Sequence, residues 1–167
     1  MSIRYSSLFA AIAGLAAGTV AAQDACGPLA RLDLEHTAVV SAANIPGDAA
    51  KRAPAYCEVH ATITPVPGSK IGAVYRLPEN WNGKVLGIGG GGFAGNVRAE
   101  SAADGLGRGY AVIQNDMGHA GESALDPSFA VDESGHRNVE GIVDFGHRAT
   151  HLATVVGKQV VERFYGR

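Results

Sequence analysis

The sequence lacks an excess of either charge. Its 14 lysine and arginine residues nearly balance 16 aspartate and glutamate residues, so the formal net charge is −2 at pH 7. This balance predicts no basic surface of the kind that binds nucleic acid or an anionic membrane. Internal repeats and low-complexity tracts are absent as well. With 167 residues and 46% hydrophobic content, the chain has the size and composition of one packed globular domain.

Long hydrophobic runs are also absent, except at the N-terminus. Arg4 precedes an apolar stretch at residues 8–20, and residues 20–22 (VAA) match a signal-peptidase site. The apolar stretch is short for a membrane span, and no stop-transfer pattern follows it. We therefore predict that residues 1–22 are a signal peptide. The chain would then be secreted or periplasmic, with no membrane association after cleavage.

Cysteine is scarce, because Cys26 and Cys57 are the only two. Two cysteines cannot complete a four-ligand zinc site. In an oxidising compartment we expect them to form a disulfide rather than to remain free thiols. Closing a loop of this size would stabilise the fold by about 3–4 kcal/mol.

Two segments alternate polar and apolar residues with the period of two that is typical of half-buried strands. They are residues 55–64 (AYCEVHATIT) and residues 70–77 (KIGAVYRL), and prolines and a glycine separate them at residues 65–68. This arrangement predicts an antiparallel hairpin.

Two apolar segments then flank a helical pattern. Residues 84–88 and 110–114 predict strands, and residues 98–108 predict a helix that ends at Gly109. A strand, a helix and a strand in this order predict the crossover unit of a parallel sheet that is buried on both faces.

The last element is expected to be a long helix that follows a loop at residues 120–139. Apolar residues three or four apart predict that it begins with Asp144 as the N-terminal cap and ends at Gly166.

The most unusual composition lies at residues 85–95 (VLGIGGGGFAG), where five of the six positions 87–92 are glycine. The letters match a dinucleotide fingerprint, but no helix opens directly after them, and a nicotinamide cofactor is scarce outside the cell. A tight turn alone would rarely need four consecutive glycines. A third interpretation is an oxyanion hole, in which backbone N–H groups face a developing alkoxide.

Three separated blocks resemble the tannase and feruloyl esterase family of α/β-hydrolases. They are LPENWNGKVLGIGGGGFAG, GYAVIQNDMGHAG and DFGHRATHLATVVGKQVVERFYG. The resemblance implies an α/β fold, the N-terminal part of an α/β-hydrolase with an opening β-hairpin, parallel strands and crossover helices. It also implies a secreted serine esterase that cleaves gallate, ferulate or related aromatic acid esters through an acyl-enzyme.

The resemblance also indicates what the chain lacks. The family carries its nucleophilic serine in a Cys-Ser-x-Gly-Gly segment shortly after the Phe-Tyr-Gly that stands here at residues 164–166. Its acid and histidine follow much later. We therefore expect residues 23–167 to be an N-terminal fragment that is truncated before the nucleophile elbow and is inactive alone. The alternative is a small secreted ligand-binding module on the same scaffold.

Candidate site residues follow from the glycine stretch and from the segment after the second parallel strand. The oxyanion-loop candidates are Gly90, Gly91 and Gly92. The substrate-pocket candidates are Phe93, Asp116 and His119. The last two either pair as acid and base or shape a loop, with Asp116 accepting backbone hydrogen bonds. We favour the loop-shaping role because neither residue belongs to the family's triad.

No pattern predicts a metal or a cofactor in this chain. His147 and His151 lie one helical turn apart but lack a third ligand. Asp126, Asp132 and Glu133 lack the dense alternation of a calcium loop. The resemblance implies calcium only in the family's lid domain, which we expect to be missing here. The expected partner is a small aromatic ester.

Overall fold

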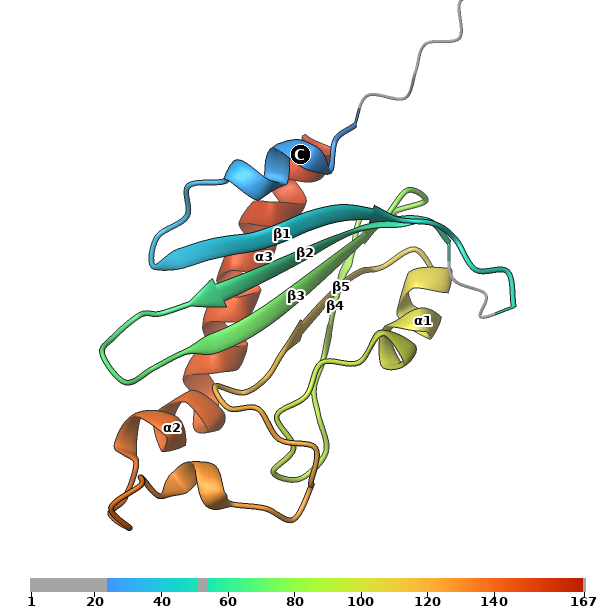
Figure 1. Cartoon of the computed structure of the whole chain (residues 1–167). Helices are drawn as coiled ribbons and strands as arrows, with labels where there is room; N and C mark the ends of the chain where they lie inside the picture. Colours follow the sequence, from blue (N-terminus) through green and yellow to red (C-terminus); the bar gives the residue numbers. More distant parts are fainter. Residues whose placement is uncertain (1–23, 51–53, 167) are drawn as a thin grey trace, which may run out of the picture.

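The computed structural model describes residues 24–50 and 54–166, and the predicted signal peptide lies outside this part. A five-stranded sheet in the order β1-β2-β3-β5-β4 forms its centre (Figure 1). The strands are β1 (Thr37–Ile45), β2 (Tyr56–Ile63), β3 (Ile71–Pro78), β4 (Val85–Ile88) and β5 (Ala111–Asn115). The helices are η1 (Gly27–Arg31), α1 (Ala99–Gly107), η2 (Ser128–Ala130), α2 (Val139–Val143), the π-helical segment η3 (Asp144–Arg148) and α3 (Ala149–Tyr165).

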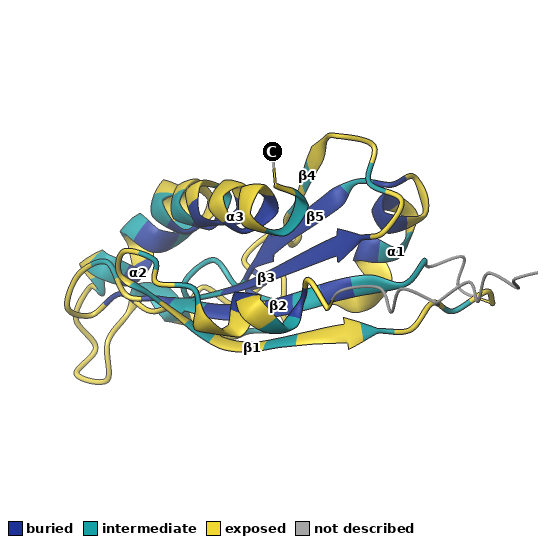
Figure 2. Ribbon diagram, turned by 90° about the horizontal axis from the view of Figure 1, so that it is seen from above, coloured by how far each residue is buried: buried dark blue, intermediate teal, exposed yellow. Residues whose placement is uncertain are grey.

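The predicted hairpin is confirmed, since β2 and β3 pair antiparallel from Tyr56↔Pro78 to Ile63↔Ile71. The alternation in β2 also holds: every second residue is buried, and the residues between are half-buried or exposed. In β3 every residue but one is buried, because the strand lies between β2 and β5, with α3 against one face of the sheet and α1 against the other (Figure 2). The strand β1, which pairs antiparallel with β2, was not predicted.

The crossover unit is confirmed, because β4 and β5 are parallel and α1 connects them. Alternate β5 residues face opposite sides of the sheet. Ile113 packs in the apolar cluster with α3, and Val112 packs in the cluster with α1. The prediction that both strands are buried on both faces is correct for β5 and wrong for β4. At the edge of the described sheet, β4 has only β5 as a neighbour, and Val85 is 36% exposed.

The final helix is confirmed at its C-terminus and corrected at its start. Gly166 has a left-handed φ of 71° and ends α3, as predicted. Helical structure begins five residues before Asp144, where the side chain of Asn138 accepts the N–H of Gly141 at 3.1 Å. Asp144 is instead 1% exposed and lies between the Ser69 hydroxyl, at 2.7 Å, and the Arg148 guanidinium, at 2.9 Å. Its carboxylate therefore joins the turn before β3 to the helix.

The predicted disulfide is present between Cys26 and Cys57, which are 1% and 2% exposed. It links the segment before η1 to β2 and lies in the main apolar cluster, together with Leu29, Val59 and Tyr75. None of the described helices is both long and apolar enough to cross a membrane.

Replacing both cysteines by alanine removes this covalent link. We expect the free energy of unfolding, measured by urea denaturation, to fall by about 3–4 kcal/mol, because the unfolded chain gains conformational freedom. A thiol reductant is the control: it should lower the urea midpoint of the unmodified chain and leave that of the variant unchanged. Equal midpoints for the two chains would contradict the prediction.

Candidate functional site

The glycine loop, residues 89–95, follows β4 and lies beside the loop that follows β5 (Figure 1). Parallel pairing from Val85↔Ala111 to Ile88↔Gln114 brings the carboxyl ends of both strands to one edge of the sheet. Open α/β sheets place their binding sites at this edge. The two segments that were singled out in the sequence are therefore neighbours in space.

Backbone hydrogen bonds join the two loops. The Phe93 N–H donates to the Ala124 carbonyl at 2.9 Å, and Gly95 and Gly121 exchange two bonds of 2.9 and 3.0 Å. A Cβ atom on Gly95 would collide with the carbonyl oxygens of Asp116 and His119. Only glycine permits this approach, so Gly95 allows the two loops to form one unit.

The oxyanion-loop candidates lie at the exposed tip of this unit. Within the described part of the chain, no hydrogen bond occupies the N–H groups of Gly90, Gly91 and Gly92. The next three N–H groups are all occupied: the Ala94 N–H closes a turn on the Gly91 carbonyl at 3.1 Å, and Phe93 and Gly95 bond to the neighbouring loop. The loop therefore presents three consecutive backbone donors that the described structure leaves unoccupied.

The tight-turn interpretation explains part of the glycine run. Gly92 has a φ of 57°, and a Cβ there would collide with the Ala124 carbonyl. A Cβ on Gly90 would lie 2.6 Å from the Ala94 carbonyl oxygen. Gly89 and Gly91, in contrast, have open space where a Cβ would stand. No contact in the described structure requires glycine at these two positions, which is consistent with space that a ligand uses.

Phe93 begins an aromatic cluster beside the glycine loop. Its ring, 40% exposed, lies 6.1 Å from Phe129 and 5.8 Å from Phe145 between centroids. His119 stacks on Phe129 at 4.3 Å. Phe145 belongs to the π-helical segment η3, which therefore contributes a ring to the cluster. An exposed aromatic surface thus adjoins the unoccupied N–H groups.

Asp116 has the contacts of a loop-shaping residue. Its carboxylate accepts the Gly118 N–H at 2.9 Å, and its carbonyl accepts the His119 N–H at 3.1 Å. Burial raises the pKa of this carboxyl above its ordinary value, although the hydrogen bond from Gly118 opposes the shift. The His119 ring bonds the Phe93 carbonyl at 2.8 Å instead of the Asp116 carboxylate. The side chains of Asp116 and His119 thus have separate hydrogen-bond partners.

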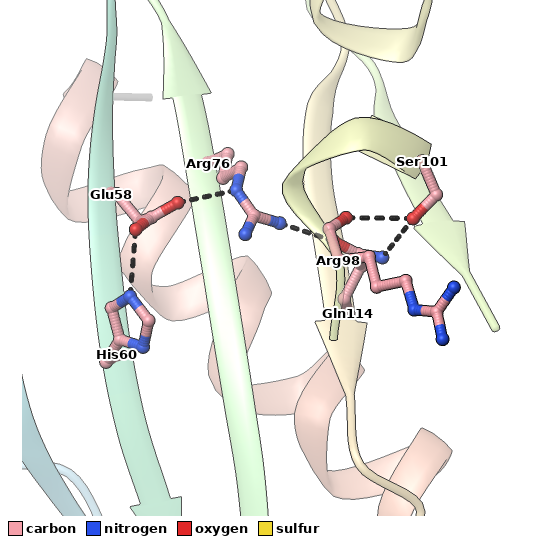
Figure 3. Close-up of polar contacts among 6 residues, drawn as sticks. All are labelled: Glu58, His60, Arg76, Arg98, Ser101 and Gln114. Atoms are coloured by element: carbon pink, nitrogen blue, oxygen red, sulfur yellow. Dashed lines mark hydrogen bonds and ion pairs between the residues drawn. The ribbon is translucent and has the colours of Figure 1, made fainter. Parts of the chain in front are cut away.

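A polar network that the sequence did not indicate crosses the sheet on the α1 side (Figure 3). The Arg76 side chain, 4% exposed, lies 2.6 Å from Glu58 and donates a hydrogen bond to Gln114. Glu58 also contacts His60 at 2.9 Å, and Gln114 donates to the Ser101 hydroxyl at 3.0 Å. Glu58 and Arg76 are direct cross-strand partners, so only the register of the hairpin reveals the pair.

This network borders a groove of about 770 Å³ that Asp116, Gly95, His60 and Arg76 also line. Burial alone would raise the pKa of Glu58, but the His60 hydrogen bond and the Arg76 charge outweigh it and lower this pKa below its ordinary value. The carboxylate is therefore ionised at neutral pH, as its buried partner Arg76 requires.

Three of the candidate metal ligands, His147, Asp126 and Asp132, have local hydrogen-bond partners. The His147 ring lies 3.2 Å from the Val143 carbonyl, one helical turn away. Asp126 accepts the N–H of Ser128, and Asp132 accepts those of Ser134 and His136. Within the described ranges, no three histidine, cysteine or acidic side chains are grouped as a metal site.

A comparison with known protein families gives a match for the larger part of this chain. The family described as "Tannase and feruloyl esterase" matches residues 57–167. A probable feruloyl esterase B-2 of Aspergillus flavus is 36% identical over 110 residues, which are 66% of this chain and 20% of the relative. An uncharacterized esterase of Xanthomonas campestris is 36% identical over 160 residues, which are 89% of this chain and 26% of the relative.

Solved structures show the same similarity. Feruloyl esterase B from Aspergillus oryzae superposes with a TM-score of 0.70 at 28% identity, over 86% of this chain and 30% of that one. Tannin acyl hydrolase from Aspergillus niger shares the fold, with a TM-score of 0.64 at 18% identity, over 85% and 29% of the two chains. The chain spans about a fifth to a quarter of the length of the curated relatives named above.

Replacing Glu58 by Gln leaves the Arg76 charge buried without its carboxylate partner. We expect the free energy of unfolding at neutral pH to fall by about 2–3 kcal/mol, less than for a fully buried pair because 18% of the Glu58 side chain is exposed. The lowered pKa means that Glu58 stabilises the native chain above its ordinary pKa and loses this effect as the pH falls through the lowered value. The difference between native chain and variant should therefore shrink in acid.

Asp104→Asn is the matched control for this substitution, because it breaks the exposed 3.5 Å pair between Asp104 and Arg108. It should change the free energy of unfolding by less than about 0.5 kcal/mol. The free energy of unfolding of both variants is measured by urea denaturation at pH values from acid to neutral. Equal effects of the two substitutions would show that the Glu58–Arg76 pair contributes no more than a surface pair.

Proposed function

Because this chain belongs to the tannase and feruloyl esterase family, we propose that it supplies the oxyanion loop and part of the substrate pocket of a secreted carboxylic-ester hydrolase. The observation that carries the proposal is the run of unoccupied N–H groups at Gly90, Gly91 and Gly92. These donors lie at the carboxyl edge of a parallel strand pair, where such a fold gathers its site.

The proposed reaction is acyl transfer through a serine acyl-enzyme. A serine hydroxyl attacks the ester carbonyl, a histidine takes its proton, and the alcohol leaves with that proton when the tetrahedral intermediate collapses. Water then releases the acid by the same steps. The role of this chain is to donate backbone hydrogen bonds to the carbonyl oxygen while it carries negative charge. The serine, histidine and acid would come from polypeptide outside this sequence.

The proposed substrates are esters of aromatic acids such as ferulate or gallate. Support comes from the names of the similar proteins, which are feruloyl esterases and a tannin acyl hydrolase. The aromatic cluster of Phe93, Phe129 and Phe145 provides an apolar surface beside the glycine loop. Aromatic rings favour offset or tilted contacts with other rings, so this surface suits a phenyl group.

Secretion is part of the proposal. The pattern at residues 1–22 supports it, and so does the buried Cys26–Cys57 disulfide, because such bridges persist mainly outside the cytosol.

The alternative function is a non-catalytic binding module on the same scaffold. It would bind an aromatic ester without turnover.

The experiment that separates the two functions begins with the coding DNA beyond the codon for Arg167. An open frame that soon encodes Cys-Ser-x-Gly-Gly would support the esterase, and the extended protein should then hydrolyse methyl ferulate or methyl gallate. The 167-residue chain alone should hydrolyse neither. A stop codon directly after Arg167, with binding of either ester, would favour the binding module instead.

The oxyanion role predicts the effect of Gly91→Ala in the extended enzyme. The added methyl group has open space in the described structure, so the chain should still fold, but the methyl would stand among the proposed donors. Alanine keeps the backbone N–H, but its methyl group would hold the carbonyl oxygen away from the donors. We expect kcat/KM for methyl ferulate to fall at least about tenfold, because loss of contact with one oxyanion donor typically costs about 10²–10³ in kcat.

Gly146→Ala is the matched control, because a Cβ there also meets open space and Gly146 is not part of the glycine loop. It should leave kcat/KM near the native value. Should Gly91→Ala retain more than about a tenth of the native kcat/KM, the oxyanion assignment would fail.

A further inference from the structure

The His119 side chain is the one described side chain that hydrogen-bonds the glycine loop. Its Nε2 lies 2.8 Å from the Phe93 carbonyl oxygen. A carbonyl can only accept, so Nε2 carries the proton of this bond. The other ring nitrogen, Nδ1, is buried and has no partner in the described structure. A proton on Nδ1 would be an unsatisfied buried donor, which favours the neutral Nε2–H tautomer.

The bond acts on the peptide group that closes the glycine turn. The carbonyl of Phe93 and the N–H of Ala94 belong to the same rigid peptide plane. His119 holds the carbonyl side of this plane, and the Gly91 carbonyl holds its N–H side at 3.1 Å. Gly92, with its left-handed φ of 57°, lies inside the turn that the Ala94–Gly91 bond closes.

Backbone in an uncommon conformation positions His119 for this bond. Met117 and Gly118 both have left-handed φ angles, 59° and 83°, and the His119 N–H closes their turn on the Asp116 carbonyl at 3.1 Å. The conformation is unfavourable for a side-chain-bearing residue such as Met117. The Asn115 side chain stabilises it by accepting the Met117 N–H at 2.9 Å.

Aromatic contacts then fix the plane of the imidazole. The ring stacks on Phe129 with centroids 4.3 Å apart and an interplanar angle of 20°. Phe145 lies on a second side, at 5.9 Å and 52°. A ring held in this way keeps Nε2 directed at the Phe93 carbonyl without the entropy loss of ordering a free side chain.

We propose that His119 is a positioning residue, which holds the glycine loop so that the N–H groups of Gly90, Gly91 and Gly92 remain directed at the reacting carbonyl. The inference rests on the proposed function and adds to it a residue that touches neither the substrate nor the reacting atoms. His119 acts on the glycine loop through its hydrogen bond to the Phe93–Ala94 peptide. Its loss should therefore weaken stabilisation of the transition state more than binding of the substrate.

The test compares His119→Phe, His119→Gln and the native enzyme in the extended protein, with methyl ferulate as the substrate. Phenylalanine retains a ring that can stack on Phe129 but has no donor, whereas glutamine restores an N–H group. We expect His119→Phe to lower kcat about 10- to 100-fold with little change in KM, because a small misplacement of positioned groups has costs of this size. His119→Gln should recover a large part of kcat.

His136→Phe is the matched control, since His136 is an exposed histidine whose ring makes no hydrogen bond in the described structure. Its kcat should equal the native value. A kcat for His119→Phe within about twofold of native would overturn the inference. Equal losses in His119→Phe and His119→Gln would also overturn it, because the donor would then be irrelevant.

Two measurements by nuclear magnetic resonance test whether His119 positions the glycine loop, and neither requires enzymatic activity. The ¹⁵N shifts of the His119 ring should be those of a neutral imidazole protonated on Nε2. The Ala94 amide should exchange its hydrogen faster in His119→Phe than in the native chain, and at the native rate in His136→Phe. A ring protonated on Nδ1, or unchanged Ala94 exchange, would overturn the inference. If the native enzyme hydrolyses no ester but these results hold, the proposed function fails, whereas the finding that His119 positions the glycine loop stands.

Discussion

The close approach of two backbone segments at Gly95 is the constraint on which the candidate site depends. Parallel pairing of β4 and β5 directs both loops to one edge, but a side chain at position 95 would separate them because the carbonyl oxygens of Asp116 and His119 occupy that space. Once the loops touch, they share backbone hydrogen bonds, and His119 reaches the Phe93 carbonyl. The N–H groups of Phe93, Ala94 and Gly95 all have partners, whereas those of Gly90, Gly91 and Gly92 just before them are unoccupied in the described structure.

The two faces of the sheet have different roles. On the α3 face, apolar residues of β2, β3 and β5 form the main cluster, and the disulfide attaches η1 to it. On the α1 face, the Glu58–Arg76–Gln114 network lies among few apolar residues (Figure 3). A buried guanidinium is stable there because it has both a carboxylate and an amide oxygen as partners. One face therefore supplies packing, and the other carries a polar groove that extends to Asp116 and the glycine loop.

Much of the fold followed from local patterns. The hairpin, the crossover unit and the C-terminal cap at Gly166 depend on periodicity and glycine conformation, which neighbouring residues decide. The strand β1 had no such pattern, because its residues are mostly exposed or half-buried and a register irregularity interrupts its pairing between Val39 and Ser41. Asp144 also misled the prediction: aspartate is typical of a helix start, yet here it is buried beside Arg148 and Ser69.

By itself the sequence determined the family, the strand–helix–strand order, the pairing of the two cysteines and the concentration of glycine after β4. These features need only composition, spacing and motifs that are contiguous in the chain. The tertiary structure decided which donors of the glycine loop are unoccupied, that the His119 ring bonds the Phe93 carbonyl and not the Asp116 carboxylate, and that Glu58 meets Arg76. Each depends on register or on the approach of distant segments, and that information is absent from the local sequence because it arises only when the sheet pairs and the loops pack.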